Sequence, residues 1–99
     1  MKMGIPEDLD FSMLELRRDT QTGDVTFRVE AIQTICVANN VDLDVVMGHE
    51  DNVAGLIIAW YAHHLLAGGK ADPVADDLID EVRLEDAKGG GFSVQPGRA

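Results

Sequence analysis

The longest uncharged stretch of this 99-residue chain covers positions 53–67 and is apolar apart from His63 and His64. It is too short to span a membrane, which takes roughly 20 apolar residues. Wound into a helix, the stretch has apolar side chains on opposite sides and almost no polar face. We therefore expect a central helix over 52–67 that the rest of the fold surrounds, with Asp51 as its N-cap and a glycine pair at its end.

A β-hairpin is predicted ahead of this helix. Residues 11–16 partly alternate between apolar and polar, residues 20–24 are turn formers, and a second short strand follows. Gly23 is able to adopt the positive φ that such a turn needs. Two strands alone are marginal in water, so the hairpin should lie against a helix. Gly55 costs the central helix about 1 kcal/mol relative to alanine, which predicts close approach of another backbone, such as that of the hairpin.

Three further helices are predicted from periodicity and capping signals. The first begins near Arg28 and has one apolar face, formed by Val29, Ile32, Ile35 and Cys36. The second is short, with Asp42 as its cap and Gly48 at its end. The third starts at an Asp-Pro pair and should cover residues 72–87. A glycine run then ends it.

The predicted fold class is α+β and mostly α: a short N-terminal β-hairpin packed on a bundle of three to four helices with a buried central helix. A chain of this length has material for one small domain. We assign this single globular domain to residues 11–88. Residues 1–10 are expected to form an acidic N-terminal arm, extended or loosely attached, and residues 89–99 a flexible C-terminal tail.

Acidic side chains dominate the surface chemistry. The chain has 18 of them against 8 lysines and arginines, a net charge of −10, and seven lie between Asp72 and Asp86 with one Arg83 among them. On a helix, one side of this segment carries Asp76, Asp77, Asp80 and Glu81. Two pairs of these acids at a spacing of four repel each other, at a cost of a few tenths of a kcal/mol apiece. Selection for binding and generic solubility both explain such a pattern.

The charge balance argues against direct binding of DNA, RNA or an anionic membrane, because phosphate is held by Lys and Arg. The spacing of the first two predicted helices is like that of a helix-turn-helix, but Asp42 and Asp44 stand where DNA reading needs basic residues. Cys36 is the sole cysteine, so an intramolecular disulfide is excluded and a reducing cytoplasm is the natural location. We expect this thiol to be a small buried apolar group. The first eight residues lack the apolar run of a secretory signal.

Catalytic arrangements are not evident, so we expect neither enzyme activity nor a cofactor. Ser12 and Ser93 lie outside any nucleophile-elbow pattern, and the glycine run follows a helix, unlike a phosphate loop. His63 and His64 are about 100° apart on a helix, so they cannot chelate a metal together. A zinc site would need His49 to meet one of them. We predict no metal site, and a metal-dependent enzyme using these histidines is the remaining alternative.

The whole chain resembles the anti-CRISPR inhibitors, small proteins encoded by phages and prophages of Gram-negative bacteria. The resemblance covers the hairpin of residues 10–27, the helix around Trp60 and the acidic segment after Pro73, and it lies in length, acidity and the lack of enzyme motifs. It implies inhibition by binding in the Lys- and Arg-rich channel where an RNA-guided complex takes up target DNA. Cas proteins of the type I-F (Csy) surveillance complex are the leading candidate partner, and the location is then the cytoplasm of the infected host.

In this interpretation carboxylates stand in for phosphates on a basic protein or nucleoprotein. The predicted partner-binding residues are Asp76, Asp77, Asp80 and Glu81, helped by Glu7, Asp8 and Asp10. The alternative is a phage structural or assembly accessory protein that acts through oligomerisation. Apolar faces would then make the contacts, and the acidic side chains would only keep the protein dissolved.

Overall fold

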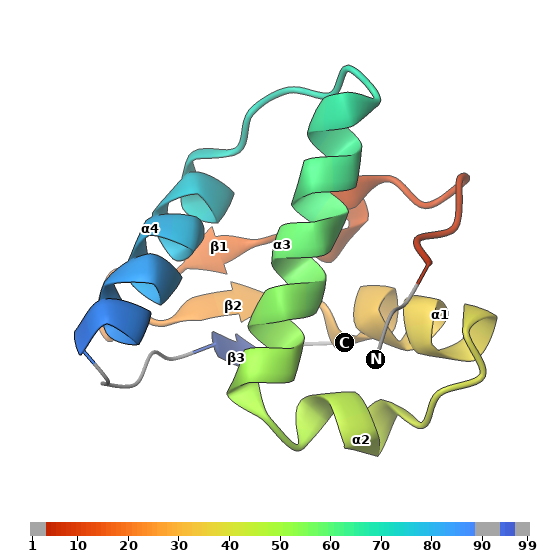
Figure 1. The fold of residues 1–99 in the computed structure, drawn as a ribbon, viewed down its shortest axis with the longest axis horizontal. Coiled ribbons are helices and arrows are strands. Elements are labelled where there is room, and N and C mark those ends of the chain that lie inside the picture. Colours follow the sequence, from red (N-terminus) through yellow and green to blue (C-terminus); the bar gives the residue numbers. More distant parts are fainter. Residues whose placement is uncertain (1–3, 89–93, 97–99) are drawn as a thin grey trace.

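The computed structural model describes residues 4–88 and 94–96, and it confirms an α+β fold that is mostly helical. Within these ranges the elements are, in order, η1 (Phe11–Leu14), β1 (Arg17–Arg18), β2 (Val25–Phe27), α1 (Val29–Ala38), α2 (Leu43–Met47), α3 (Glu50–Leu66), α4 (Pro73–Lys88) and β3 (Val94–Pro96). Helix α3 stands at the centre, with α4 on one side of it and α1 and α2 on the other (Figure 1).

The predicted hairpin is present, but its first strand is shorter than expected. Asp10 accepts a hydrogen bond from the backbone N–H of Ser12 at 2.9 Å and so caps η1, a 3-10 turn. This turn occupies positions that we expected to begin the strand. Strand β1 pairs antiparallel with β2, with Arg17 opposite Thr26. Gly23 has a φ of 80° and makes the turn, as the sequence predicted.

A third strand lies where the sequence predicted a tail. Strand β3 runs parallel to β2, with Val94 opposite Val25, and the sheet order is β1-β2-β3. For Val94–Pro96 this corrects the expected flexible tail over 89–99, whose other residues lie outside the described part. The four helices intervene between the two paired strands. Such a distant pairing leaves no local signal in the sequence.

The described part of the N-terminal arm is tied to the domain, which corrects the expectation of a loose attachment. The side-chain amide of Asn39 accepts a hydrogen bond from Gly4 N–H at 2.9 Å and donates one to Gly4 C=O at 2.8 Å. Ile5 and Leu9 pack partly buried against the core. Asn39 is also the C-cap residue of α1. Positions 4–10 are therefore part of the packed structure.

The first two helices follow the prediction closely. Helix α1 turns its apolar face to the core through Ala31, Ile32, Ile35 and Cys36. Asp42 caps α2 by accepting a hydrogen bond from Asp44 N–H at 3.1 Å, and Gly48 follows the last helical residue. Cys36 is buried, as expected.

Helix α3 forms the centre of the core through one side only. It begins two residues early, with His49 rather than Asp51 in the N-cap position. The buried side consists of Val53, Ala54, Leu56, Ile57, Trp60 and Tyr61. Phe11 packs edge-to-face on Trp60, with ring centroids 5.6 Å apart. The expectation that the fold surrounds this helix is therefore wrong: one side is buried in the core, and the opposite side is exposed. A chain this short has too little material to cover both.

Gly55 lies on the exposed side of α3. The sequence predicted that another backbone of the chain would approach it closely, but a Cβ atom added at this position would have no described atom within 4 Å. This corrects the prediction.

Candidate functional site

The acidic segment forms α4, and its first residues are capped as the sequence predicted. Asp72 accepts hydrogen bonds from the backbone N–H groups of Val74 at 2.9 Å and Ala75 at 3.3 Å. Pro73 occupies the first helical position, where it needs no donor. Ala75 and Leu78 are buried against the core. Of the four predicted binding residues on this helix, Asp76, Asp77 and Asp80 are exposed on the other side, and Glu81 is half-buried beside them.

Asp76 has an internal partner. The hydroxyl group of Tyr61 donates a hydrogen bond to Asp76 Oδ1 at 2.9 Å and accepts one from the backbone N–H of Asp72, also at 2.9 Å. Tyr61 is buried, so its hydroxyl joins the core helix to the first turn of α4. Burial raises the pKa of Tyr61 above 10; the bond to Asp76 adds to the rise and the Asp72 N–H opposes it. Asp76 therefore has a structural role whatever it binds.

Glu81 also has an internal partner. Its Oε1 lies 2.6 Å from Nη2 of Arg18, in the hairpin. Nη1 of Arg18 donates a hydrogen bond to the backbone carbonyl of Gly23, in the hairpin turn. The ion pair thus ties α4 to the hairpin. Its two side chains are about one-third exposed, which limits its contribution to stability to about 1 kcal/mol or less.

Asp77 and Asp80 remain as the free part of the acidic face. Both are exposed, and among the side chains that the structure describes neither has a hydrogen-bond or ion-pair partner. Arg83 is exposed one turn beyond Asp80, beside the exposed side chain of Leu84. The outer side of α4 is therefore most negative in its first half, around Asp76, Asp77 and Asp80.

The acids of the arm lie at a different place. Glu7, Asp8 and Asp10 border a hollow of about 360 Å³ at the C-terminal end of α3, together with His63 and His64. Hydrogen bonds from Ser12 lower the pKa of Asp10 below its ordinary value of 3.8. Asp10 also borders a second hollow with Asp72 and Pro73 at the start of α4. The structure thus brings Asp10 near the N-terminus of α4, whereas Glu7 and Asp8 face the end of α3.

The histidines do not form the zinc site that the alternative required. His49 precedes the first turn of α3 and the other two lie in its last turn, so the helix holds them about 20 Å apart. The ring of His64 stacks on Phe11 with centroids 5.3 Å apart, and its Nε2 lies 2.8 Å from the carbonyl oxygen of Lys70. Over the described residues, no three His, Cys, Asp or Glu side chains lie close enough together to hold a metal ion.

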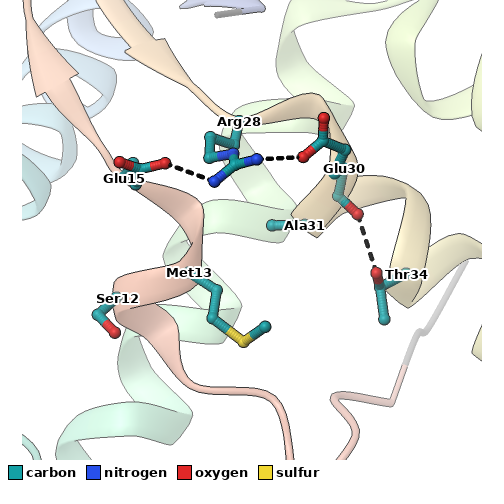
Figure 2. Close-up of a pocket in the computed structure, with 7 residues that line it drawn as sticks. All are labelled: Ser12, Met13, Glu15, Arg28, Glu30, Ala31 and Thr34. Carbon is teal, nitrogen blue, oxygen red and sulfur yellow. Dashed lines mark hydrogen bonds and ion pairs between the residues drawn. The ribbon is translucent and has the colours of Figure 1, made fainter. Parts of the chain in front are cut away.

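A hollow of about 410 Å³ lies between η1 and α1, away from the acidic helix. Figure 2 shows Arg28 at its edge between two carboxylates. The guanidinium donates to Glu15 Oε2 at 2.9 Å and to Glu30. Both bonds raise the pKa of Arg28. Within this hollow the cation is therefore already paired, which leaves little charge to attract a ligand.

Sequence reasoning missed two residues that shape the candidate site, Tyr61 and Arg18. Tyr61 was counted with the apolar residues of the core helix, although a buried tyrosine needs a partner for its hydroxyl. That need is a usable signal, and the nearest abundant acceptors are the carboxylates of the following helix. Arg18 gave no comparable signal, because its pairing with Glu81 depends on how the hairpin packs.

In the comparisons with known proteins, no family model, curated protein or solved structure matches the chain. In the part of the chain that the structure describes, no helix is both long and apolar enough to cross a membrane. The fold and surface define a small α+β protein with a mixed three-stranded sheet and an outer helix rich in carboxylates.

Proposed function

We propose that this protein acts by binding, and that the outer side of α4 docks on a Lys- and Arg-rich surface of a protein or nucleoprotein. The observation that carries the proposal is the pair of exposed carboxylates Asp77 and Asp80, beside Asp76, in a chain with a net charge of −10. Such a surface accelerates encounter with a basic partner and fixes its register. No bond is made or broken in this mechanism.

The resemblance to anti-CRISPR inhibitors supplies the class of partner. We propose a phage-encoded inhibitor that binds Cas proteins of the type I-F (Csy) surveillance complex in the host cytoplasm and blocks their uptake of target DNA. Carboxylates of α4 occupy the sites of DNA phosphates on lysines and arginines. Asp77 and Asp80 contribute most, because no side chain that the structure describes is bonded to them. Asp76 and Glu81 contribute less, because Tyr61 already engages Oδ1 of Asp76 and Arg18 already pairs with Oε1 of Glu81.

Charge reversal tests this mechanism. The double variant Asp77→Lys/Asp80→Lys should weaken binding to the purified complex by about ten- to a hundredfold, since each site loses an attraction and gains a repulsion. Asp44→Lys is the matched control, because Asp44 is an exposed helical acid outside α4. Its binding should stay close to that of the unmodified protein. Competition with labelled target DNA, repeated at several salt concentrations, measures both effects, and affinity should fall as salt rises.

If the two variants bind equally well, the carboxylates of Asp77 and Asp80 do not contribute to binding. If the purified complex does not bind the protein at all, the same two variants serve in affinity capture from bacterial lysate followed by mass spectrometry. A basic protein retained by Asp44→Lys and lost with Asp77→Lys/Asp80→Lys keeps the electrostatic mechanism and replaces the partner. If both variants capture the same proteins, the electrostatic mechanism is refuted.

A second candidate function is an assembly protein that works through oligomerisation. Exposed apolar side chains favour it: Leu66 is 89% exposed, Val37 73% and Val45 53%. Exposed groups of this kind often mark protein contacts when they are contiguous. A concentration-dependent oligomer with no affinity for CRISPR proteins would favour this function. A protein that co-purifies with a basic nucleoprotein favours inhibition.

A further inference from the structure

Arg18 lies against the acidic helix α4 but belongs to strand β1. Its Nη2 is 2.6 Å from Oε1 of Glu81, and its Nη1 donates a hydrogen bond to the carbonyl of Gly23. The neighbouring strand residue, Arg17, points to the opposite face and lies 3.7 Å from Glu15. Among the ion pairs of the described residues, the one between Arg18 and Glu81 is therefore the one that reaches α4.

The contact between Arg18 and Glu81 is close but poorly aligned. Nη2 is buried, yet no hydrogen bond of normal geometry joins it to a described atom, so Glu81 compensates its charge by proximity alone. A guanidinium and a carboxylate pair most strongly through two parallel hydrogen bonds that use both oxygens. Oε2 of Glu81 has no bonded partner among the described side chains. A better aligned guanidinium can therefore replace Arg18.

Asp77 gives such a second guanidinium a further contact. It lies one helical turn before Glu81, so the two side chains are neighbours on the surface of α4. Asp77 is exposed, and the side chain of Glu81 is 39% exposed, so both can be reached from outside. An arginine of a docked protein can lie between these two carboxylates. Arg18, which is held at the hairpin turn by Gly23, contacts Glu81 alone.

We propose that Arg18 is a built-in competitor of the basic partner: it occupies Glu81 in the free protein, and an arginine side chain of the partner takes its place in the complex. This inference rests on the proposed function of α4 and adds a restraint to it. The displaced side chain of Arg18 is already 30% exposed, so it can turn towards solvent on release.

The competitor makes the acidic side of α4 more selective. In the free protein Arg18 neutralises one carboxylate and places a positive charge beside the docking surface, which weakens the attraction for any basic surface. A partner with an arginine at this point recovers the lost attraction by pairing with Glu81 and Asp77. A surface without such an arginine leaves Arg18 in place and gains less.

An NMR titration of the unmodified protein tests the exchange. The probe is an unlabelled oligo-arginine peptide of about ten residues, added to the nitrogen-15-labelled chain so that only guanidinium groups of the protein give signals. The Nε–H signal of Arg18 should shift with the same dissociation constant as the backbone signals of Asp77 and Asp80. Arg28 is the internal control, because two carboxylates hold it at the hollow between η1 and α1, away from α4. Its signal should stay in place.

Two matched variants measure how strongly Arg18 opposes binding. Arg18→Met keeps the apolar stem of the side chain without its charge, so Glu81 is released and the dissociation constant for the peptide should fall about threefold. Arg17→Met removes the same charge from the same strand without changing the contact of Glu81, and it should change the constant by less than about 1.5-fold. In a Glu81→Gln background, Arg18→Met should act no more strongly than Arg17→Met.

The exchange and the docking role of α4 fail separately in these experiments. If the signals of Asp77 and Asp80 respond to the peptide and that of Arg18 does not, the exchange is overturned and the docking role stands. Equal affinity of Arg18→Met and Arg17→Met also overturns the exchange. If neither Asp77 nor Asp80 responds, the docking role fails and the exchange fails with it. Should Arg18→Met not fold, the titration of the unmodified protein still decides.

Discussion

Removing the hydroxyl group of Tyr61 should destabilise the protein by about 2 kcal/mol. In the variant Tyr61→Phe, the backbone N–H of Asp72 loses its acceptor and Asp76 loses its donor, each from a bond of 2.9 Å. A buried donor left without a partner costs about 1–3 kcal/mol, and a hydrogen bond to a charged group contributes about 1.5–3 kcal/mol. Because Asp76 is exposed, a water molecule can replace the lost hydroxyl donor, which makes the destabilisation smaller. The ring itself stays packed on Phe11, at 5.3 Å between centroids.

A double-mutant cycle measures how much of this cost belongs to the pair. Asp76→Ala alone should cost about 1 kcal/mol, since the hydroxyl keeps its bond to Asp72 and the carboxylate is exposed. Because the two side chains share one hydrogen bond, Tyr61→Phe/Asp76→Ala should be less destabilised than the sum, by about 0.5–1.5 kcal/mol. Urea denaturation at pH 7 gives all four free energies. Asp80→Ala, an exposed acid with no described partner, is the control and should stay within about 0.5 kcal/mol.

Alkaline pH gives a second measurement on the same group. The pKa of Tyr61 is raised in the folded state, so above pH 10 the unfolded chain loses this proton before the folded one does. The free energy of unfolding should then fall as pH rises, and the fall should be smaller in Tyr61→Phe. A cost below 0.5 kcal/mol for Tyr61→Phe at pH 7, or strict additivity in the cycle, would refute the bridging role.

Three further outcomes are expected. Gly55→Ala should raise the free energy of monomer unfolding by about 0.5–1 kcal/mol in urea, because the new methyl group meets open space; a decrease would contradict the geometry. Arg18→Ala should cost about 0.5–1 kcal/mol through lost contacts with Glu81, whereas Arg17→Ala, whose side chain is 76% exposed, should cost less in the same assay. Burial raises the pKa of the Cys36 thiol, so a thiol reagent should label it only as fast as the protein opens, and labelling at the rate of a free thiol would be inconsistent with its burial.

The parts of the fold that follow from local chemistry were predictable. Asp42 and the Asp72–Pro73 pair cap helices because their side chains and ring act on the adjacent backbone, and the structure confirms both. Gly23 makes the hairpin turn for a similar reason. In each case the determining atoms lie within a few residues of one another, so the spacing in the sequence carries the information.

The parts that depend on distant contacts were not predictable in the same way. Gly4 is held by Asn39 across 35 positions, and β3 pairs with β2 although helices α1 to α4 lie between them in the sequence. The periodicity of α3 showed apolar groups on both sides and could not tell which side the fold covers. Among the candidate site residues, the division of the acidic face into bonded and free carboxylates depended on Tyr61 and Arg18, which come from other elements.

The division of the acidic face into bonded and free carboxylates bears on whether these acids serve binding or solubility. The acidic face contains two repelling pairs at a spacing of four, and one member of each pair has a stabilising partner: Tyr61 for Asp76 and Arg18 for Glu81. Asp77 and Asp80 receive no such compensation among the described residues, so their repulsion from the bonded members is a net cost to the fold. Solubility alone does not require that cost at these two positions, because acids spread over the surface serve it equally well. If Asp77→Ala/Asp80→Ala is more stable than the parent but loses affinity for a basic partner, binding explains why the repulsion is kept. If the variant is more stable and keeps every affinity, generic solubility is the better explanation of these acids.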